Sequence, residues 1–292
     1  MKVSPQVSAV PPSDALRPAA GVALAAWAAR VRADKEQVER LREVADPADF
    51  YAPVAQRFRH DPRRTDDAAL NVLRELCRPD DVWLDIGAGG GRYALPIALR
   101  TREVVCVEPS AGMIEVLRQG MGESGISNVR ILEGRWPLPA FGDRADVSLM
   151  AHVGYDIEEI GPFLEAMEAA TQRTCVAVLG KGAMTTTATL FWGPIHGEPR
   201  VALPALPELL TLLLARGRLP EVQLVDREPP TFDTLDDLLS MARRQLWVRS
   251  DSAKDVELQR LVRDVSSARH GRWALDWRAS KIGVVTWEPA AS

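Results

Sequence analysis

The sequence predicts a doubly wound α/β fold: a seven-stranded, mostly parallel sheet whose last strand is antiparallel, with an N-terminal helical cap and a C-terminal helical insertion. Three observations support this prediction. Short apolar runs alternate with stretches of helical periodicity from residue 66 onward, which is typical of a parallel sheet covered on both faces. A glycine-rich turn joins the first apolar run to the next helix. Hydrophobic residues make up 46% of the 292 positions, enough for a large core.

The N-terminal part of the chain precedes this alternation. Residues 1–18 are rich in proline and poor in large apolar side chains, so we expect a flexible tail. Beyond them, apolar residues such as Trp27 and Val31 recur at helical spacing, with charged residues on the other face. We therefore expect residues 19–65 to form a helical cap and residues 66–292 to form the main domain.

The main domain begins with a helix that Asp66 or Asp67 caps and that ends ahead of Pro79. After it, apolar runs and helical stretches follow each other in turn. Strands are expected at 82–86, 104–107, 129–132, 146–150, 175–179 and 222–225, and helices at 93–99, 111–119, 158–170 and 206–214.

Two segments interrupt the alternation. Residues 181–204 lack a clear period, and we expect a lid-like loop there. Residues 233–270 contain two helical stretches and are interpreted as a helical insertion. The chain closes with residues 273–277 and 282–287, which the pattern favours as a pair of antiparallel strands.

Composition limits the classes of function. The net charge of -4 provides no overall positive field for a polyanion, which argues against a nucleic-acid substrate. No stretch approaches the ~20 uncharged apolar residues that span a membrane. The three cysteines are widely spaced in apolar runs, as buried, reduced thiols are, and no two histidines stand at metal-ligand spacing. These observations predict a cytoplasmic protein with neither a membrane span nor a metal.

The most informative segment is the turn from Asp85 to Arg92, which reads Asp-Ile-Gly-Ala-Gly-Gly-Gly-Arg. Glycines let the backbone turn sharply and approach a ligand, and the helix that follows favours negative charge at its N-terminus. A dinucleotide-binding turn requires a further glycine where Arg92 stands. Asp85 also places an anion where phosphates would approach. Glu108, at the end of the second expected strand, suits ribose hydroxyls, so the turn favours a ligand with a ribose and no phosphate.

This segment resembles the first motif of the class I S-adenosylmethionine-dependent methyltransferases, an acidic residue followed by Gly-x-Gly-x-Gly after the first strand. The resemblance covers roughly residues 66–180. It implies S-adenosylmethionine as the methyl donor and S-adenosylhomocysteine as its product. The donor-binding residues that it implies are Asp85, Gly87, Ala88, Gly89 and Gly91 at the turn, Glu108 on the ribose, and Pro109, Ser110 and Met113 on the adenine side.

One position departs from the family pattern. Family members often carry an acid after the third strand, near the adenine amino group, whereas Arg135 stands at that position here. A backbone group or stacking by Trp136 would then contact the adenine. The alternative is that Trp136 packs under the sheet, and the sequence leaves both open.

Catalytic candidates follow from the position of ligands in open parallel sheets, beyond the carboxyl ends of the strands. His152, after the fourth strand, is a candidate general base and lies beside the donor. Tyr155 would orient the acceptor. His196, in the expected lid, is a further candidate. The alternative for His152 is a structural hydrogen bond to the backbone.

The predicted function is methyl transfer from S-adenosylmethionine to a small-molecule acceptor, with positioning supplying most of the rate. One alternative is an RNA or protein methyltransferase, which the basic cluster of Arg57, Arg59, Arg63 and Arg64 would favour. Aspartates interrupt this cluster, so a salt-bridged surface is the stronger interpretation. A second alternative is a non-catalytic S-adenosylmethionine-binding protein. A homodimer is compatible with the sequence.

Overall fold

The computed structural model describes residues 19–138, 142, 144–183, 189–227, 229–269, 271–275 and 280–290. The expected flexible tail, residues 1–18, lies outside them. The strands of the main sheet are β1 (Val82–Ile86), β2 (Glu103–Glu108), β3 (Val129–Glu133), β4 (Ala145–Ala151), β5 (Thr171–Gly180), β6 (Glu221–Arg227) and β9 (Ser280–Trp287).

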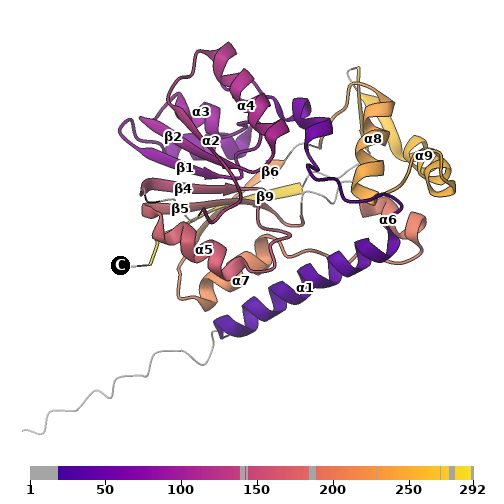
Figure 1. The fold of residues 1–292 in the computed structure, drawn as a ribbon, viewed down its shortest axis with the longest axis horizontal. Coiled ribbons are helices and arrows are strands. Elements are labelled where there is room, and N and C mark those ends of the chain that lie inside the picture. The colour runs from indigo at the N-terminus through magenta and orange to yellow at the C-terminus, as the bar shows by residue number, and fades with distance from the viewer. Residues whose placement is uncertain are drawn as a thin grey trace, which may run out of the picture.

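Within the described residues these strands form one seven-stranded sheet in the order β3-β2-β1-β4-β5-β9-β6 (Figure 1). β1 to β5 pair in parallel, whereas β9 runs antiparallel to both β5 and β6. β6 therefore runs in the same direction as β5. The predicted fold class, with a single antiparallel strand that comes last in the chain, is confirmed.

Helices cover both faces of the sheet (Figure 1). On one face lie α2 (Ala68–Leu76), α3 (Ala94–Ala98) and α4 (Ala111–Ser124), and on the other lie α5 (Ile160–Ala169) and α7 (Leu206–Ala215). Side chains alternate between the faces along each strand. In β1, Trp83 packs with the α2 side and Leu84 with the α5 side, and both are fully buried.

Polar side chains define where helices of the first face begin. The carboxylate of Asp67 accepts a hydrogen bond from the backbone N–H of Leu70 at 3.1 Å, which caps α2 as the sequence predicts. The hydroxyl of Ser110 accepts one from the N–H of Met113 at 3.1 Å and caps α4. Both caps satisfy N–H groups that the first helical turn leaves free.

The N-terminal helix α1 (Ala20–Leu41) lies outside α5 and α7 (Figure 1). Trp27 and Val31 are buried in the same core cluster as those helices. The indole N–H of Trp27 also donates to the carbonyl of Ile157 at 2.9 Å. The first helix is thereby fixed to the segment that follows β4. No helix of the described part of the chain is both long and apolar enough to cross a membrane.

The prediction of an irregular loop over 181–204 is wrong for Thr189–His196, which form helix α6. Phe191, Trp192 and Ile195 lie on one side of this helix and are buried against the helical insertion. This packing stabilises a short helix although Pro194 lies inside it. Residues 184–188 lie outside the described part of the chain.

The insertion between β6 and β9 contains α8 (Leu235–Leu246) and α9 (Ala253–Val265), as the two helical stretches predict. The guanidinium of Arg243 on α8 donates to both carboxylate oxygens of Asp255 on α9, at 2.6 and 3.0 Å. Asp255 is fully buried, so this ion pair holds the two helices together in the interior.

The predicted pairing of residues 273–277 with 282–287 is wrong. β8 (Arg272–Leu275) pairs instead with β7 (Ser266–Arg269), which directly follows α9, in a separate two-stranded sheet. β9 has buried residues on both faces, among them Val284 and Val285. Two-sided burial places this strand in the interior of the main sheet, between β5 and β6.

Candidate functional site

The glycine turn connects β1 to α3 and depends on residues without a side chain. Gly87, Gly89 and Gly91 have φ values of 75°, 54° and 83°, a region that disfavours side chains. A Cβ on Gly87 would lie 2.5 Å from Cγ2 of Val153, and one on Gly91 would lie 2.5 Å from Cδ1 of Leu117. Backbone conformation and crowding therefore both require glycine at the first and third of these positions.

Asp85 ends β1 immediately before this turn and is 2% exposed. Its Oδ1 has no hydrogen-bond partner among the described residues. Burial, and secondarily the negative charge of Glu108, raises the pKa of Asp85 to about 7. A buried carboxylate oxygen without a donor is unfavourable alone. The Oδ1 atom of Asp85 therefore suits a ligand that donates a hydrogen bond from an ammonium or hydroxyl group.

Glu108 ends β2 and connects the turn to α4. One carboxylate oxygen accepts the N–H of Gly89 at 2.8 Å, and the other accepts the N–H of Ser110 at 2.9 Å. Burial raises the pKa of Glu108 in spite of these two hydrogen bonds. Each carboxylate oxygen has a further lone pair, so the side chain is held in place and can still accept hydrogen bonds from two neighbouring hydroxyls.

The remaining donor-binding residues expected from the sequence lie around the same turn or close to it. Ala88, Ser110 and Met113 are buried there, and Pro109 is exposed. The positive charge of Arg135 opposes, as a small contribution, the rise that burial causes in the pKa of Glu108, so the guanidinium lies in the neighbourhood of that carboxylate. Trp136 packs against the core, and its indole N–H donates to the carbonyl of Phe163 at 3.2 Å. These contacts favour packing under the sheet over stacking on an adenine.

Sequence reasoning missed Asp49. The hydroxyl of Ser110 donates to its two carboxylate oxygens, both at 2.9 Å, and the N–H of Gly112 donates at 3.3 Å. A Cβ on Gly112 would lie 2.7 Å from Cα of Ala52. The connector after α1, including the 3-10 helix η2 (Ala52–Phe58), therefore lies directly on the start of α4. No local pattern around Asp49 indicates this contact, because its partners lie about 60 residues further along the chain.

His152 directly follows β4 and has an unusual backbone, with a φ of 57°. Its backbone N–H donates to the carbonyl of Val178 at 2.8 Å. Neither ring nitrogen has a partner among the described residues, and both are buried. Burial, followed by the charges of Arg92 and Arg227, lowers the pKa of His152 to about 3. The imidazole is therefore neutral near pH 7 and weakly basic, and its ring makes no structural hydrogen bond to the described backbone.

Tyr155 lies in the same segment, with its hydroxyl turned toward the end of β5. The hydroxyl accepts the N–H of Gly180 at 2.9 Å. Burial raises the pKa of Tyr155 to about 12, so the phenol stays protonated and retains its own proton to donate. The catalytic roles of His152 and Tyr155 stay predictions.

The structure does not bring His196 to this group. Its Nε2 lies 2.9 Å from the carbonyl oxygen of Leu246, and its Nδ1 lies 3.2 Å from Nζ of Lys254. The ring also lies against Trp192, with centroids 4.3 Å apart. All these partners belong to α6 and the helical insertion, so His196 is held where α6 meets α8 and α9.

The basic cluster in the connector is largely ion-paired. Arg57 pairs with Asp237, Arg59 with Glu123, and Arg64 with Asp67. Arg63 donates to the carbonyl of Ser124 at 3.4 Å. These contacts agree with the salt-bridged surface that the interrupting aspartates indicate.

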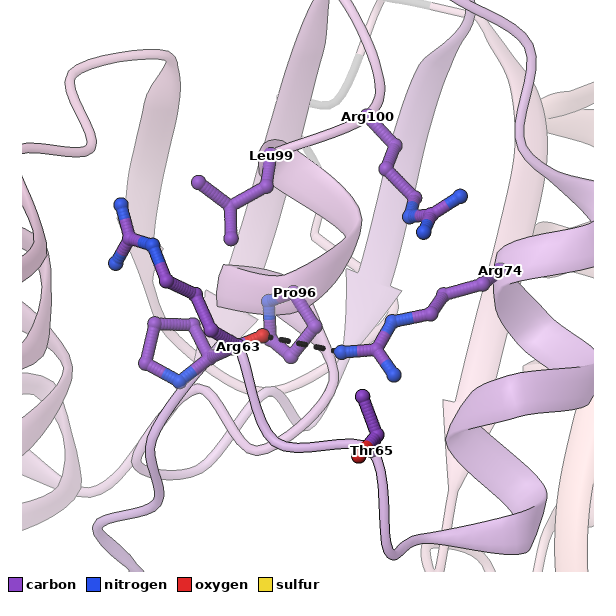
Figure 2. A pocket seen from close by; sticks show the side chains of 7 residues that line it. Arg63, Thr65, Arg74, Pro96, Leu99 and Arg100 are labelled. Carbon is purple, nitrogen blue, oxygen red and sulfur yellow. Dashed lines mark hydrogen bonds between the residues drawn. The ribbon is translucent and has the colours of Figure 1, made fainter.

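A cavity of about 370 Å³ lies between the segment before α2, α2 itself and the end of α3 (Figure 2). Arg63, Arg74 and Arg100 line it, and the guanidinium of Arg74 donates to the carbonyl of Pro62 at 3.2 Å. The cavity lies at the end of α3 away from the glycine turn, so it does not belong to the candidate site.

Comparisons with known proteins find similarity to methyltransferases. A family model described as a methyltransferase domain matches residues 84–173. A relative from Bacillus subtilis, the uncharacterized methyltransferase YcgJ, is 29% identical over 32% of this chain and 38% of its own length. The match thus spans well under half of that relative. The ubiquinone biosynthesis O-methyltransferase of Brucella anthropi is 25% identical over 74% of this chain and 93% of its own length.

Solved structures show the same fold. The crystal structure of YcgJ from Bacillus subtilis matches with a TM-score of 0.53 and 18% identity, over 76% of this chain and 99% of that one. A putative methyltransferase from Bacillus halodurans matches with a TM-score of 0.54 and 15% identity, over 77% and 100%.

Proposed function

The chain belongs to the class I S-adenosylmethionine-dependent methyltransferase family, and we propose that it transfers the donor's methyl group to a small-molecule acceptor. One observation carries the proposal: the unpartnered, buried Oδ1 of Asp85 lies next to a turn that only glycine fits, with Glu108 fixed across it. This combination suits the amino-acid and ribose parts of S-adenosylmethionine.

S-adenosylmethionine supplies a methyl group on a positively charged sulfur, and the protein supplies position. Glu108 would hold the ribose, Asp85 and the glycine turn the amino-acid part, and Ser110 and Met113 the adenine side. Sulfonium charge disappears during transfer, so a nearby excess of carboxylates would stabilise the donor more than the transition state. His152 and Tyr155, beyond β4, are uncharged near pH 7 and meet this condition. Alignment of donor and acceptor would then provide most of the rate.

A small acceptor is favoured over RNA because free positive charge is scarce at the connector. Binding to a nucleic acid requires several lysines or arginines to reach phosphates, and Arg57, Arg59 and Arg64 already have carboxylate partners. The relatives include enzymes named for ubiquinone biosynthesis and for methylation of ribosomal RNA. Of these, the ubiquinone biosynthesis enzyme matches over most of this chain.

The test is transfer of tritium from methyl-labelled S-adenosylmethionine to three separated fractions: small metabolites, total RNA and protein. We expect label in the metabolite fraction alone. Label in RNA or protein would overturn the small-molecule assignment. Binding of S-adenosylhomocysteine without label in any fraction would identify a non-catalytic binding protein.

Donor binding is also expected to depend on pH through Asp85. A ligand ammonium or hydroxyl favours the ionised carboxylate, and the raised pKa of about 7 means that Asp85 takes up a proton as the pH falls below 7. Affinity for S-adenosylhomocysteine should therefore be full above pH 8 and fall by about 30-fold at pH 5.5, roughly tenfold per pH unit. Calorimetry across this range measures it. Asp85→Asn should bind more weakly at pH 8 and show a flat profile, whereas an unchanged slope would assign the proton to another group.

A further inference from the structure

Beside the glycine turn, beyond the carboxyl ends of β4 and β6, lies a group of side chains that donor binding does not use. We call this group the cationic cluster. Its members are Arg64, Asp67, Arg92, Tyr93, His152 and Arg227. It lies at the edge of the sheet where ligands of open parallel sheets bind.

Positive charge exceeds negative charge in this cluster. The carboxylate of Asp67 accepts from Arg64 at 3.1 Å and from Arg92 at 2.8 and 3.3 Å. Against the effect of burial, these two arginines and the backbone N–H of Leu70 hold the pKa of Asp67 at about 2. One carboxylate therefore pairs with two guanidinium groups.

Arg227, at the end of β6, is the third cation. It is half-buried, and no carboxylate of the described chain pairs with it. Burial, and then the charge of Arg92, lowers the pKa of Arg227. Burial, and then the charges of Arg92 and Arg227, lowers the pKa of His152. β6, which Arg227 ends, packs against α2, the helix that Asp67 caps. The cluster therefore holds three guanidinium groups and one carboxylate, an arrangement that an added anion would stabilise.

The cluster also contains buried polar atoms without partners. As far as the described residues go, these are the two ring nitrogens of His152. The hydroxyl of Tyr93 has no partner with good hydrogen-bond geometry. The nearby guanidinium of Arg92 opposes the rise that burial causes in the pKa of Tyr93, and the hydroxyl keeps its own proton to donate. The two rings lie 6.3 Å apart, and the guanidinium of Arg92 lies 5.4 Å from the centre of the Tyr93 ring. A buried polar group without a hydrogen bond is unfavourable, and His152 adds backbone strain at a φ of 57°. The neutral imidazole has one N–H and the phenol one O–H to donate, and these two donors suit an acceptor-only group such as an anion.

We propose that the acceptor carries an anionic group, a carboxylate or a phosphate, and that this group binds between Arg227 and Arg92 with hydrogen bonds from Tyr93 and His152. This proposal rests on the proposed function, because it assigns the acceptor side of the same site. Arginine binds such anions through two parallel N–H donors. The anionic group anchors the acceptor, and the atom that receives the methyl lies elsewhere on the molecule.

The test uses the full chain saturated with S-adenosylhomocysteine and three probes: benzoate, its uncharged counterpart benzamide, and inorganic phosphate. Binding is followed by the ring resonances of His152, assigned by their loss in His152→Asn, and by calorimetry. Benzoate or phosphate should shift these resonances saturably, whereas benzamide should not. The stronger of the two anions identifies the carboxylate or the phosphate as the natural group.

Arg227→Gln should weaken anion binding by about tenfold or more, as expected for loss of a charged, two-point contact. Arg227→Lys should bind the anion more tightly than Arg227→Gln and more weakly than the wild type. Lysine keeps the positive charge but lacks the two parallel N–H donors of the guanidinium. Arg263→Gln on the exposed side of α9 removes the same charge elsewhere and should change affinity by less than about twofold. Affinity for S-adenosylhomocysteine should stay unchanged in all three variants.

Three results would overturn the inference: no anion shifts the His152 resonances, benzamide binds as tightly as benzoate, or Arg263→Gln weakens binding as much as Arg227→Gln. Each of these leaves the proposed function intact as long as S-adenosylhomocysteine binds. Wild-type protein that fails to bind S-adenosylhomocysteine overturns the proposed function itself and the inference with it.

Discussion

Replacing Glu108 by alanine is expected to weaken binding of S-adenosylhomocysteine by about 100-fold, which corresponds to about 2.7 kcal/mol. The carboxylate would accept hydrogen bonds from the ribose, and bonds to a charged group contribute about 1.5–3 kcal/mol each. It also accepts the N–H groups of Gly89 and Ser110. Removing it therefore loosens the turn and the start of α4 in addition to deleting the ribose contact. Calorimetry at pH 8, where Asp85 is ionised, measures the loss.

The matched control is Glu103→Ala, at the opposite end of the same strand. Glu103 pairs with Arg130 at 3.0 Å on the surface, and exposed pairs contribute at most about 1 kcal/mol to stability. This variant should bind S-adenosylhomocysteine like the wild type. Equal losses in the two variants would mean that the effect comes from general destabilisation of β2 and that Glu108 has no special role in binding.

The glycine turn and Glu108 could be predicted because their causes are local. Positive φ values in a tight turn strongly favour glycine, and a strand followed by such a turn fixes where Asp85 lies. β1 and β2 pair in parallel, and Ile86 lies opposite Val107. This register places Glu108, the next residue of β2, beside the start of the glycine turn. The cap at Asp67 has an equally local origin, an aspartate ahead of an apolar helical pattern.

What the sequence did not reveal depends on contacts between distant segments. α6 forms where Phe191 and Trp192 meet α8 and α9, and nothing within residues 181–204 indicates that surface. β8 pairs with β7 in place of β9, because β9 is taken up by the main sheet. The contact of Asp49 with Ser110 likewise joins segments that are far apart in the chain.

The candidate site divides in the same way. The proposed donor side follows from the glycine turn and the acid that ends the next strand, whereas the proposed acceptor side combines Arg92 from the turn, His152 from the end of β4 and Arg227 from the end of β6. A single arginine at the end of a strand has no pattern that distinguishes it from a surface residue. The excess of positive charge becomes visible only when the three strand ends meet, so the chemistry of the acceptor could not be predicted from the sequence.

Gly91→Ala is expected to destabilise the protein by about 2–5 kcal/mol, the sum of a backbone and a packing contribution. A side chain at a left-handed φ costs about 1–2 kcal/mol, and here φ is 83°. The new Cβ would also lie 2.5 Å from Cδ1 of Leu117 and 2.9 Å from Cγ of Leu95. Overpacking of a filled core adds about 1–3 kcal/mol, and both leucines are buried. Urea unfolding of the free protein measures the change.

Gly122→Ala is the matched control, because it adds the same methyl group to a glycine in α4 with no atom within 4 Å of the new Cβ. Alanine favours a helix over glycine by about 0.5–1 kcal/mol, so this variant should be slightly more stable than the wild type.

A saturating ligand stabilises the native state by about 2.7 kcal/mol at 100 times its Kd. Gly91→Ala should lose part of this gain as well, because Gly91 belongs to the turn that we propose contacts the donor. If the urea concentration at the midpoint of unfolding is the same for Gly91→Ala as for the wild type, the crowding around Leu117 does not constrain the turn. If it is destabilised but retains the full ligand-induced gain, the strain acts on the fold alone and the geometry of the turn does not limit donor binding.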